Sequence, residues 1–160
     1  MDEPSWLEKA RGYIDLGMFD EASKVIASLP EERQKSPEAK EMQIVILLDR
    51  QKLEEAFTLS RDLAESDPEN HAGFIQGAYA LHAMNKTQAA IDFLQTGPHS
   101  LRDDQCYFYN LACYELALGR SEAALTWLTQ SIQLDSRNRT RALNDPDLKS
   151  LRDQIPGKVK

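Results

Sequence analysis

Small and apolar residues recur along the chain at a spacing of 34 residues. Sliding the sequence against itself by this distance aligns, without insertion or deletion, Ala22, Ala56, Ala90 and Ala124. Twelve residues earlier, the same register contains Ala10, Ile44, Ala78 and Ala112. Five residues before each aligned alanine lie the turn positions Gly17, Gln51, Asn85 and Gly119. A fixed period of this length predicts a stack of repeated supersecondary units.

Each repeat is predicted to contain two helices. Gly17, Asn85 and Gly119 suit the left-handed conformation that ends a helix, and Ser36-Pro37 suits a capped helix start with proline at the first helical position. Asp67-Pro68 breaks the chain before the third repeat. We therefore predict an all-α fold with helices over residues 4–16, 20–29, 37–50, 53–66, 71–84, 87–96, 104–118 and 121–134.

The pattern resembles the tetratricopeptide repeat. The residues that carry the resemblance are Trp6, Gly17, Phe19 and Asp20-Glu21-Ala22; Leu53-Glu54-Glu55-Ala56 and Asp67-Pro68; Ala78, Ala90 and Ile91; and Asn110-Leu111-Ala112, Leu118-Gly119, Ala123-Ala124 and Leu134-Asp135. The resemblance implies a right-handed α-solenoid of antiparallel helix pairs, a single domain over residues 1–160 with repeats at about 3–36, 37–70, 71–104 and 105–138. Pro30 and Pro98 come four residues early, so the second helices of repeats 1 and 3 are expected to be about one turn short, with longer linkers.

Residues 139–156 are predicted to cap the last repeat. Ala142 and Leu143 end one short helix, Asp145-Pro146 begins another, and Leu148, Leu151 and Ile155 form an apolar stripe. A terminal unit of this kind shields the last hydrophobic face of a solenoid. Residues 157–160 are expected to be a tail.

Composition and charge disfavour nucleic-acid-binding and membrane-bound classes of protein. The chain is 41% apolar and 28% charged, which is typical of a globular protein, and its net charge of −7 disfavours nucleic acid and anionic lipid as partners. It contains no apolar stretch of the ~18 residues that a membrane span requires. With an acidic beginning, MDEPSWLEKARGY, these features predict a cytoplasmic protein.

Cys106 and Cys113 lie about 10 Å apart on one predicted helix, too far for a disulfide.

No motif for catalysis or cofactor binding occurs in the sequence, so we expect neither an enzyme nor a cofactor. The resemblance places His82 near Cys106 or Cys113. A zinc site needs four ligands, or three and an open position, and a Cys–His nucleophile pair needs a third group to orient it. We therefore expect no metal site and no catalytic residue.

The resemblance also implies that the first helices line a concave groove that binds a partner protein. The groove residues carried over from the family are Leu7, Arg11, Ile14, Met42, Val45, Leu48, Ile75, Tyr79, His82, Tyr109 and Cys113. Acidic residues, Glu38, Glu41 and Asp49, border the apolar strip, so the expected ligand combines spaced apolar side chains with Lys or Arg. Tyr79 and Tyr109 are the predicted anchors.

The identity of the partner separates several functional hypotheses, one of which the sequence disfavours. The clamp that grips the C-terminal carboxylates of heat-shock chaperones needs lysine and asparagine in one first helix, asparagine in the next, and lysine and arginine in the third. The matching positions here hold Leu7, Arg11, Met42, Ala72 and Gln76, or one repeat later Glu41, Val45, Gln76, Cys106 and Asn110. Neither set supplies the required cations, so this clamp is not expected. A specific version of the interaction module is a small bacterial secretion chaperone. The alternative is a self-assembling structural unit, in which the groove or open end of one copy docks on another.

Overall fold

The structure is a computed structural model that describes residues 3–157. Within this range the chain forms helices and turns and no strand, so the predicted all-α fold is confirmed. The chain divides into two compact units, Met1–Ala80 and Leu81–Lys160. Most of the predicted tail, residues 158–160, lies outside the described residues.

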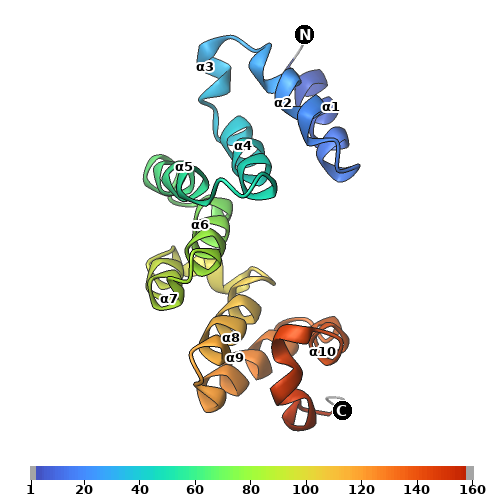
Figure 1. Ribbon diagram of the computed structural model, residues 1–160, viewed down its shortest axis with the longest axis vertical. Helices are drawn as coiled ribbons and strands as arrows, with labels where there is room; N and C mark the ends of the chain where they lie inside the picture. The colour runs from blue at the N-terminus through green and yellow to red at the C-terminus, as the bar shows by residue number, and fades with distance from the viewer. Residues whose placement is uncertain (1–2, 158–160) are drawn as a thin grey trace. The chain divides into compact units, whose positions relative to one another are not determined.

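The first unit is built from successive helices that pack in pairs (Figure 1). Its helices are α1 (Glu3–Asp15), α2 (Phe19–Ala27), α3 (Glu31–Gln34), α4 (Pro37–Asp49), α5 (Leu53–Ser66) and most of α6 (His71–Ala83). Helix α1 packs against α2 and α4, and α4 packs against α5. A hydrophobic core that includes Trp6, Ala10, Ile26 and Ile46 joins the first of these helices.

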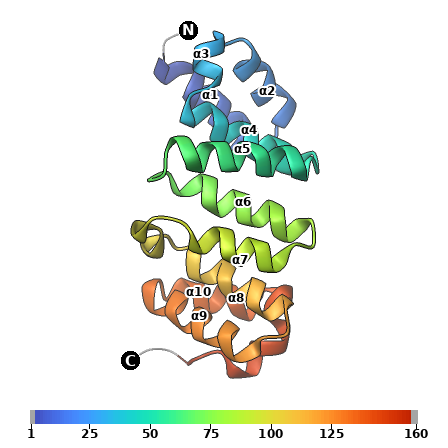
Figure 2. The same ribbon diagram turned by 90° about the vertical axis from the view of Figure 1, so that its left-hand side faces the viewer.

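The second unit begins with the last residues of α6 and ends with two short helices (Figure 2). Its elements are α7 (Thr87–Gln95), the 3₁₀ helix η1 (His99–Asp103), α8 (Tyr107–Ala117), α9 (Ser121–Leu134), α10 (Arg137–Leu143) and the 3₁₀ helix η2 (Pro146–Gln154). Helix η2 packs against α8, α9 and α10. Leu148, Leu151 and Ile155 are buried in one core with Tyr109 and Leu128, as expected of a cap.

Turn chemistry sets the helix ends. The left-handed conformation occurs at all four predicted turn positions, Gly17, Gln51, Asn85 and Gly119. Glutamine is uncommon in this conformation, which costs an L-residue with a Cβ more than it costs glycine. The hydroxyl of Ser36 accepts a hydrogen bond from the N–H of Ala39, and Pro37 follows it at the first position of α4. The eight predicted helices are thus present, with ends that agree to within three residues.

The linkers after the short second helices contain structure that the sequence analysis did not predict. Helices α2 and α7 have nine residues each, whereas α5 and α9 have fourteen, which confirms the predicted shortening. The chain that follows them folds into α3 and η1, each directly after a proline, Pro30 or Pro98. Helix α8 begins at Tyr107 rather than at residue 104, because η1 occupies the preceding residues and Asp104 accepts a hydrogen bond from the N–H of Cys106.

Candidate protein-interaction site

In the first unit, Tyr79 is the most exposed aromatic residue of the predicted groove. Half of its surface is accessible, and it lies on α6 one turn after the partly buried Ile75. Residues four apart on a helix share a face, so these two side chains form one apolar surface on α6. Val45 and Leu48 on α4 are partly buried, as are Leu7 and Ile14 on α1, which pack against the core.

Met42 corrects one of the groove predictions. Its side chain is 5% exposed and belongs to the core shared by α1, α2 and α4, so it is not available to a partner. The resemblance to the family had placed Met42 on the groove because of its position in the repeat alone. Arg11 and the bordering acidic residues Glu38 and Asp49 are exposed, as predicted, while Glu41 accepts a hydrogen bond from the side-chain amide of Asn70.

In the second unit, Tyr109 is a second correction. Its ring is 1% exposed, and its hydroxyl donates a hydrogen bond to Asp145 Oδ2 at 2.6 Å. The guanidinium carbon of Arg141 lies 3.8 Å from the ring centroid. Burial and the hydrogen bond to Asp145 raise the pKa of the Tyr109 hydroxyl. Tyr109 therefore joins α8 to the start of η2, and its ring is covered rather than accessible to a partner.

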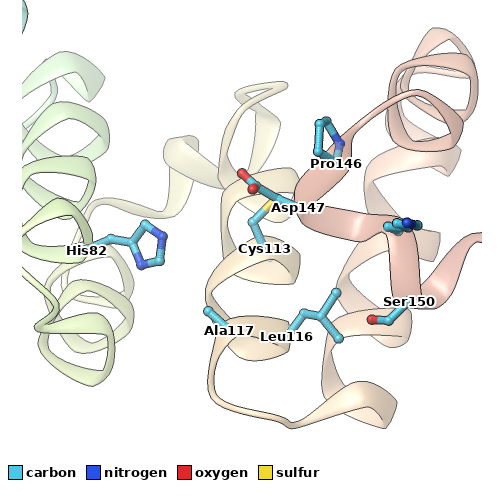
Figure 3. Close-up of a pocket in the computed structure, with 8 residues that line it drawn as sticks. His82, Cys113, Leu116, Ala117, Pro146, Asp147 and Ser150 are labelled. Atoms are coloured by element: carbon cyan, nitrogen blue, oxygen red, sulfur yellow. The ribbon is translucent and has the colours of Figure 1, made fainter.

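A pocket of about 660 Å³ lies between the end of α6, helix α8 and η2, entirely within Leu81–Lys160. Figure 3 shows His82 projecting from α6 toward α8, with Cys113 on α8 and Asp147 at the start of η2. The lining residues are His82, Cys113, Leu116, Ala117, Pro146, Asp147, Lys149 and Ser150. Two predicted groove residues, His82 and Cys113, thus line one cavity.

His82 is held on two sides. Its Nδ1 lies 2.9 Å from the hydroxyl oxygen of Thr87, and its ring lies 4.8 Å from the ring of Tyr114, between centroids. Burial lowers the pKa of His82 below its ordinary value, and the negative charge of Asp147 opposes that shift. The imidazole is accordingly neutral at pH 7.

Cys113 is a poor nucleophile in this environment. Burial raises the pKa of its thiol to about 12, so the thiol is protonated at neutral pH. Thr87, not a carboxylate, lies against His82 Nδ1, so the orienting group that a Cys–His pair would need is not placed there. Within residues 3–157, no group of three or more His, Cys, Asp or Glu side chains is arranged to hold a metal ion.

Comparison with known families identifies the repeat. The family model described as "Tetratricopeptide repeat" matches residues 107–138, which contain α8 and α9. The resemblance to the tetratricopeptide-repeat family is confirmed. No curated protein matches the chain significantly.

Solved structures of tetratricopeptide-repeat proteins share the fold. PilF of Pseudomonas aeruginosa matches with a TM-score of 0.77 and 18% identity over 98% of this chain and 77% of that chain. TTC0263 of Thermus thermophilus, described as a thermophilic TPR protein, matches with a TM-score of 0.77 and 16% identity over 96% and 98% of the two chains. A structure of MamA AMB-1 matches with a TM-score of 0.61 and 21% identity over 84% of this chain and 79% of that chain. At these identities the matches confirm the solenoid fold and carry no function with them.

The half of the pocket that η2 contributes was not predicted from the sequence. Pro146, Asp147, Lys149 and Ser150 line it, yet the sequence pattern indicated only that this segment caps the last repeat. The available signal was the Asp145-Pro146-Asp147 sequence, in which one acidic residue begins a helix and another remains at its surface.

Among the described residues, no helix is long and apolar enough to cross a bilayer.

Proposed function

We propose that the chain is a non-enzymatic protein-interaction module that binds an extended or helical segment of another protein on the faces of its first helices. The observation that carries the proposal is the half-exposed Tyr79 on α6. Tyrosine combines a large apolar face with a hydroxyl and loses little entropy when it is held in an interface. An exposed tyrosine beside partly buried apolar residues is a suitable anchor for a partner.

Charge supports a partner with basic residues. The chain has a net charge of −7, and Glu38 and Asp49 are exposed at the two ends of α4. Acidic side chains at the rim of an interface accelerate encounter with a basic segment, whereas apolar anchors supply most of the affinity. The proposed ligand therefore presents apolar side chains together with Lys or Arg. The protonated Cys113 and the neutral His82 are consistent with a binding function.

Tyr79→Ala tests the proposal. Wild-type protein and the variant are used as bait in extracts of the source cell, and proteins that depend on Tyr79 are identified by quantitative mass spectrometry. With a purified partner, we expect Tyr79→Ala to raise Kd at least about fivefold, since truncated interface anchors cost about 1 kcal/mol or more. Added salt should reduce the association rate more than it raises the dissociation rate.

Phe57→Ala is the matched control. Phe57 is a partly buried aromatic residue on α5, a second helix, so its truncation removes an aromatic ring from an element outside the proposed binding faces. The control should leave Kd within about twofold of the wild-type value. If Phe57→Ala abolishes binding and Tyr79→Ala does not, the partner binds the second helices and the proposed surface is wrong.

A further inference from the structure

We propose that the pocket between the end of α6, α8 and η2 accepts an arginine or lysine side chain of the partner segment, with the cationic group at the carboxylate of Asp147. The inference rests on the proposed function, because it names the chemistry of one part of the partner. It concerns residues of the second unit alone, whereas the anchor Tyr79 belongs to the first.

The pocket has the two kinds of surface that such a side chain requires. Leu116, Ala117 and Pro146 provide apolar lining for the methylene stem, and Asp147 and Ser150 provide oxygen acceptors for the head group. Figure 3 shows Leu116 and Ala117 on α8, and Pro146, Asp147 and Ser150 on η2. The volume of about 660 Å³ leaves room for adjoining backbone of the bound segment as well.

The charges favour a cation. In the described part of the chain, the carboxylate of Asp147 forms no ion pair, and its backbone N–H donates to Asp145 Oδ1. The neighbouring carboxylate of Asp145 is already occupied by the hydroxyl of Tyr109. Asp147 is therefore an acceptor without a partner, on a short side chain at a defined helix start.

Lys149 is the competing charge in the lining. Its ammonium is carried on a long flexible stem, and the residue is exposed, so the charge can remain in water while a cation binds at Asp147. Asp147 is exposed as well, but its short side chain has only two torsions and holds the carboxylate near the start of η2. An anionic ligand would need Lys149 to bind it beside an unpaired carboxylate, which like-charge repulsion disfavours.

His82 makes the site sensitive to pH. The Thr87 hydroxyl from α7 and the Tyr114 ring from α8 contact its ring, and the neutral Cys113 thiol from α8 lines the same pocket with Asp147 and Lys149 from η2. Asp147 is the group whose charge acts on the imidazole. Because the pKa of His82 is lowered, the ring is neutral at pH 7 and gains its proton only in more acidic solution. The added positive charge then competes for Asp147, so cation binding weakens as pH falls.

The test uses small probes and the complete chain. N-acetyl-arginine methylamide, its neutral isostere N-acetyl-citrulline methylamide, and N-acetyl-glutamate methylamide are titrated into ¹⁵N-labelled protein at about pH 7.5 and at an acidic pH at which the His82 ring is protonated. The readout is the chemical shift of the backbone amides of Ala117, Asp147 and Ser150. We expect the arginine probe to bind at least about fivefold more tightly than the citrulline probe at the higher pH, and the glutamate probe to leave these amides unshifted.

Three variants assign the effect to named residues. Asp147→Asn should reduce arginine binding to the citrulline level, whereas Asp153→Asn, which removes the same charge from η2 outside the pocket lining, should preserve it. His82→Gln should abolish the loss of affinity between the two pH values. Melting curves of all variants establish that each remains folded.

Three results would overturn the proposal: equal binding of the arginine and citrulline probes, shifts of the pocket amides by the glutamate probe, or unchanged arginine binding by Asp147→Asn. The outcome is separable from that of the proposed function. If these probes fail but Tyr79→Ala still weakens binding of a protein partner, the cation pocket is wrong and the interaction module stands. If the probes bind and Tyr79→Ala has no effect, the pocket is correct and the role of Tyr79 is wrong.

Discussion

Tyr79 and Tyr109 are tyrosines on first helices, but their surroundings give them different roles. Tyr79 is half exposed on α6, whereas Tyr109 is covered within a core that includes Leu148 and Leu151 of η2. A buried tyrosine hydroxyl needs a hydrogen-bond partner, and Asp145, at the start of η2, accepts its hydrogen bond. The repeat position alone does not distinguish the two tyrosines, because the difference comes from chain that folds back onto α8.

Tyr109→Phe tests the bond between α8 and the cap. The variant keeps the ring and removes the hydroxyl that donates to Asp145. A hydrogen bond to a charged acceptor contributes about 1.5–3 kcal/mol, so the free energy of unfolding in urea should fall by about that amount. Tyr79→Phe is the control, and should change stability by less than about 0.5 kcal/mol because its hydroxyl belongs to a half-exposed residue. Equal changes in the two variants would show that the Tyr109 bond does not stabilise the cap.

At the scale of elements, the sequence specified helices well and linkers poorly. Helix positions follow from signals within each repeat, such as the turn residues Gly17, Asn85 and Gly119 and the Ser36-Pro37 start. The short helices α3 and η1 have four and five residues, too few for an apolar period to appear in the sequence. The close approach of Gly73 on α6 to α5 is likewise invisible in a sequence pattern, because it depends on how two helices pack.

Gly73→Ala and Gly12→Ala form a matched pair of substitutions within helices. A Cβ at Gly73 would lie 2.9 Å from the backbone of both Ser60 and Ala64, whereas one at Gly12 would meet nothing within 4 Å. Alanine is intrinsically better than glycine in a helix by about 1 kcal/mol. Gly12→Ala should therefore raise the free energy of unfolding by up to that amount. Gly73→Ala should lower it by about 1–3 kcal/mol through overpacking, despite the same propensity gain.

Urea denaturation of the two variants against the wild type provides the measurement. The sign of the change is the informative quantity, since the two substitutions are chemically identical. Stabilisation by Gly73→Ala would mean that α5 and α6 separate readily, and that the contact between their backbones is not tight.

The residues of the proposed binding surface also differ in whether the sequence of a single repeat could predict them. Tyr79 and the partly buried residues of α1 and α4 could be selected from their positions in the repeat. The pocket was not predicted, because the sequence pattern indicated only a cap for residues 139–156, although Asp147 follows Cys113 by one repeat period. Only the packing of η2 against α8 brings Asp147 to the cavity.

At the scale of the whole molecule, each compact unit contains a hydrophobic core of its own residues. One core contains Trp6 with residues of α1, α2 and α4, and the other joins α8 and α9 to α10 and η2, with Trp127 packed against it. The chain contains two tryptophans, so each unit has its own fluorescent reporter. Trp127 also stacks on Phe108 with 5.7 Å between ring centroids, and its emission therefore depends on the packing of α8 and α9.

Removing residues 144–160 tests whether the end of the chain is a cap, and the two tryptophans locate the effect. The deletion takes away Leu148, Leu151 and Ile155, which are buried in the core of the second unit, and uncovers Tyr109 and Leu128. Newly exposed apolar surface should lower the melting temperature and cause association that light scattering detects at increasing protein concentration. In a Trp6→Phe background, which reports on Trp127, the melting transition should shift to a lower temperature by several degrees. In a Trp127→Phe background, which reports on Trp6, the shift should be smaller because no residue of that core is removed. An unchanged Trp127 transition would show that the segment does not act as a cap, and an equal shift of both transitions would show that the units unfold together.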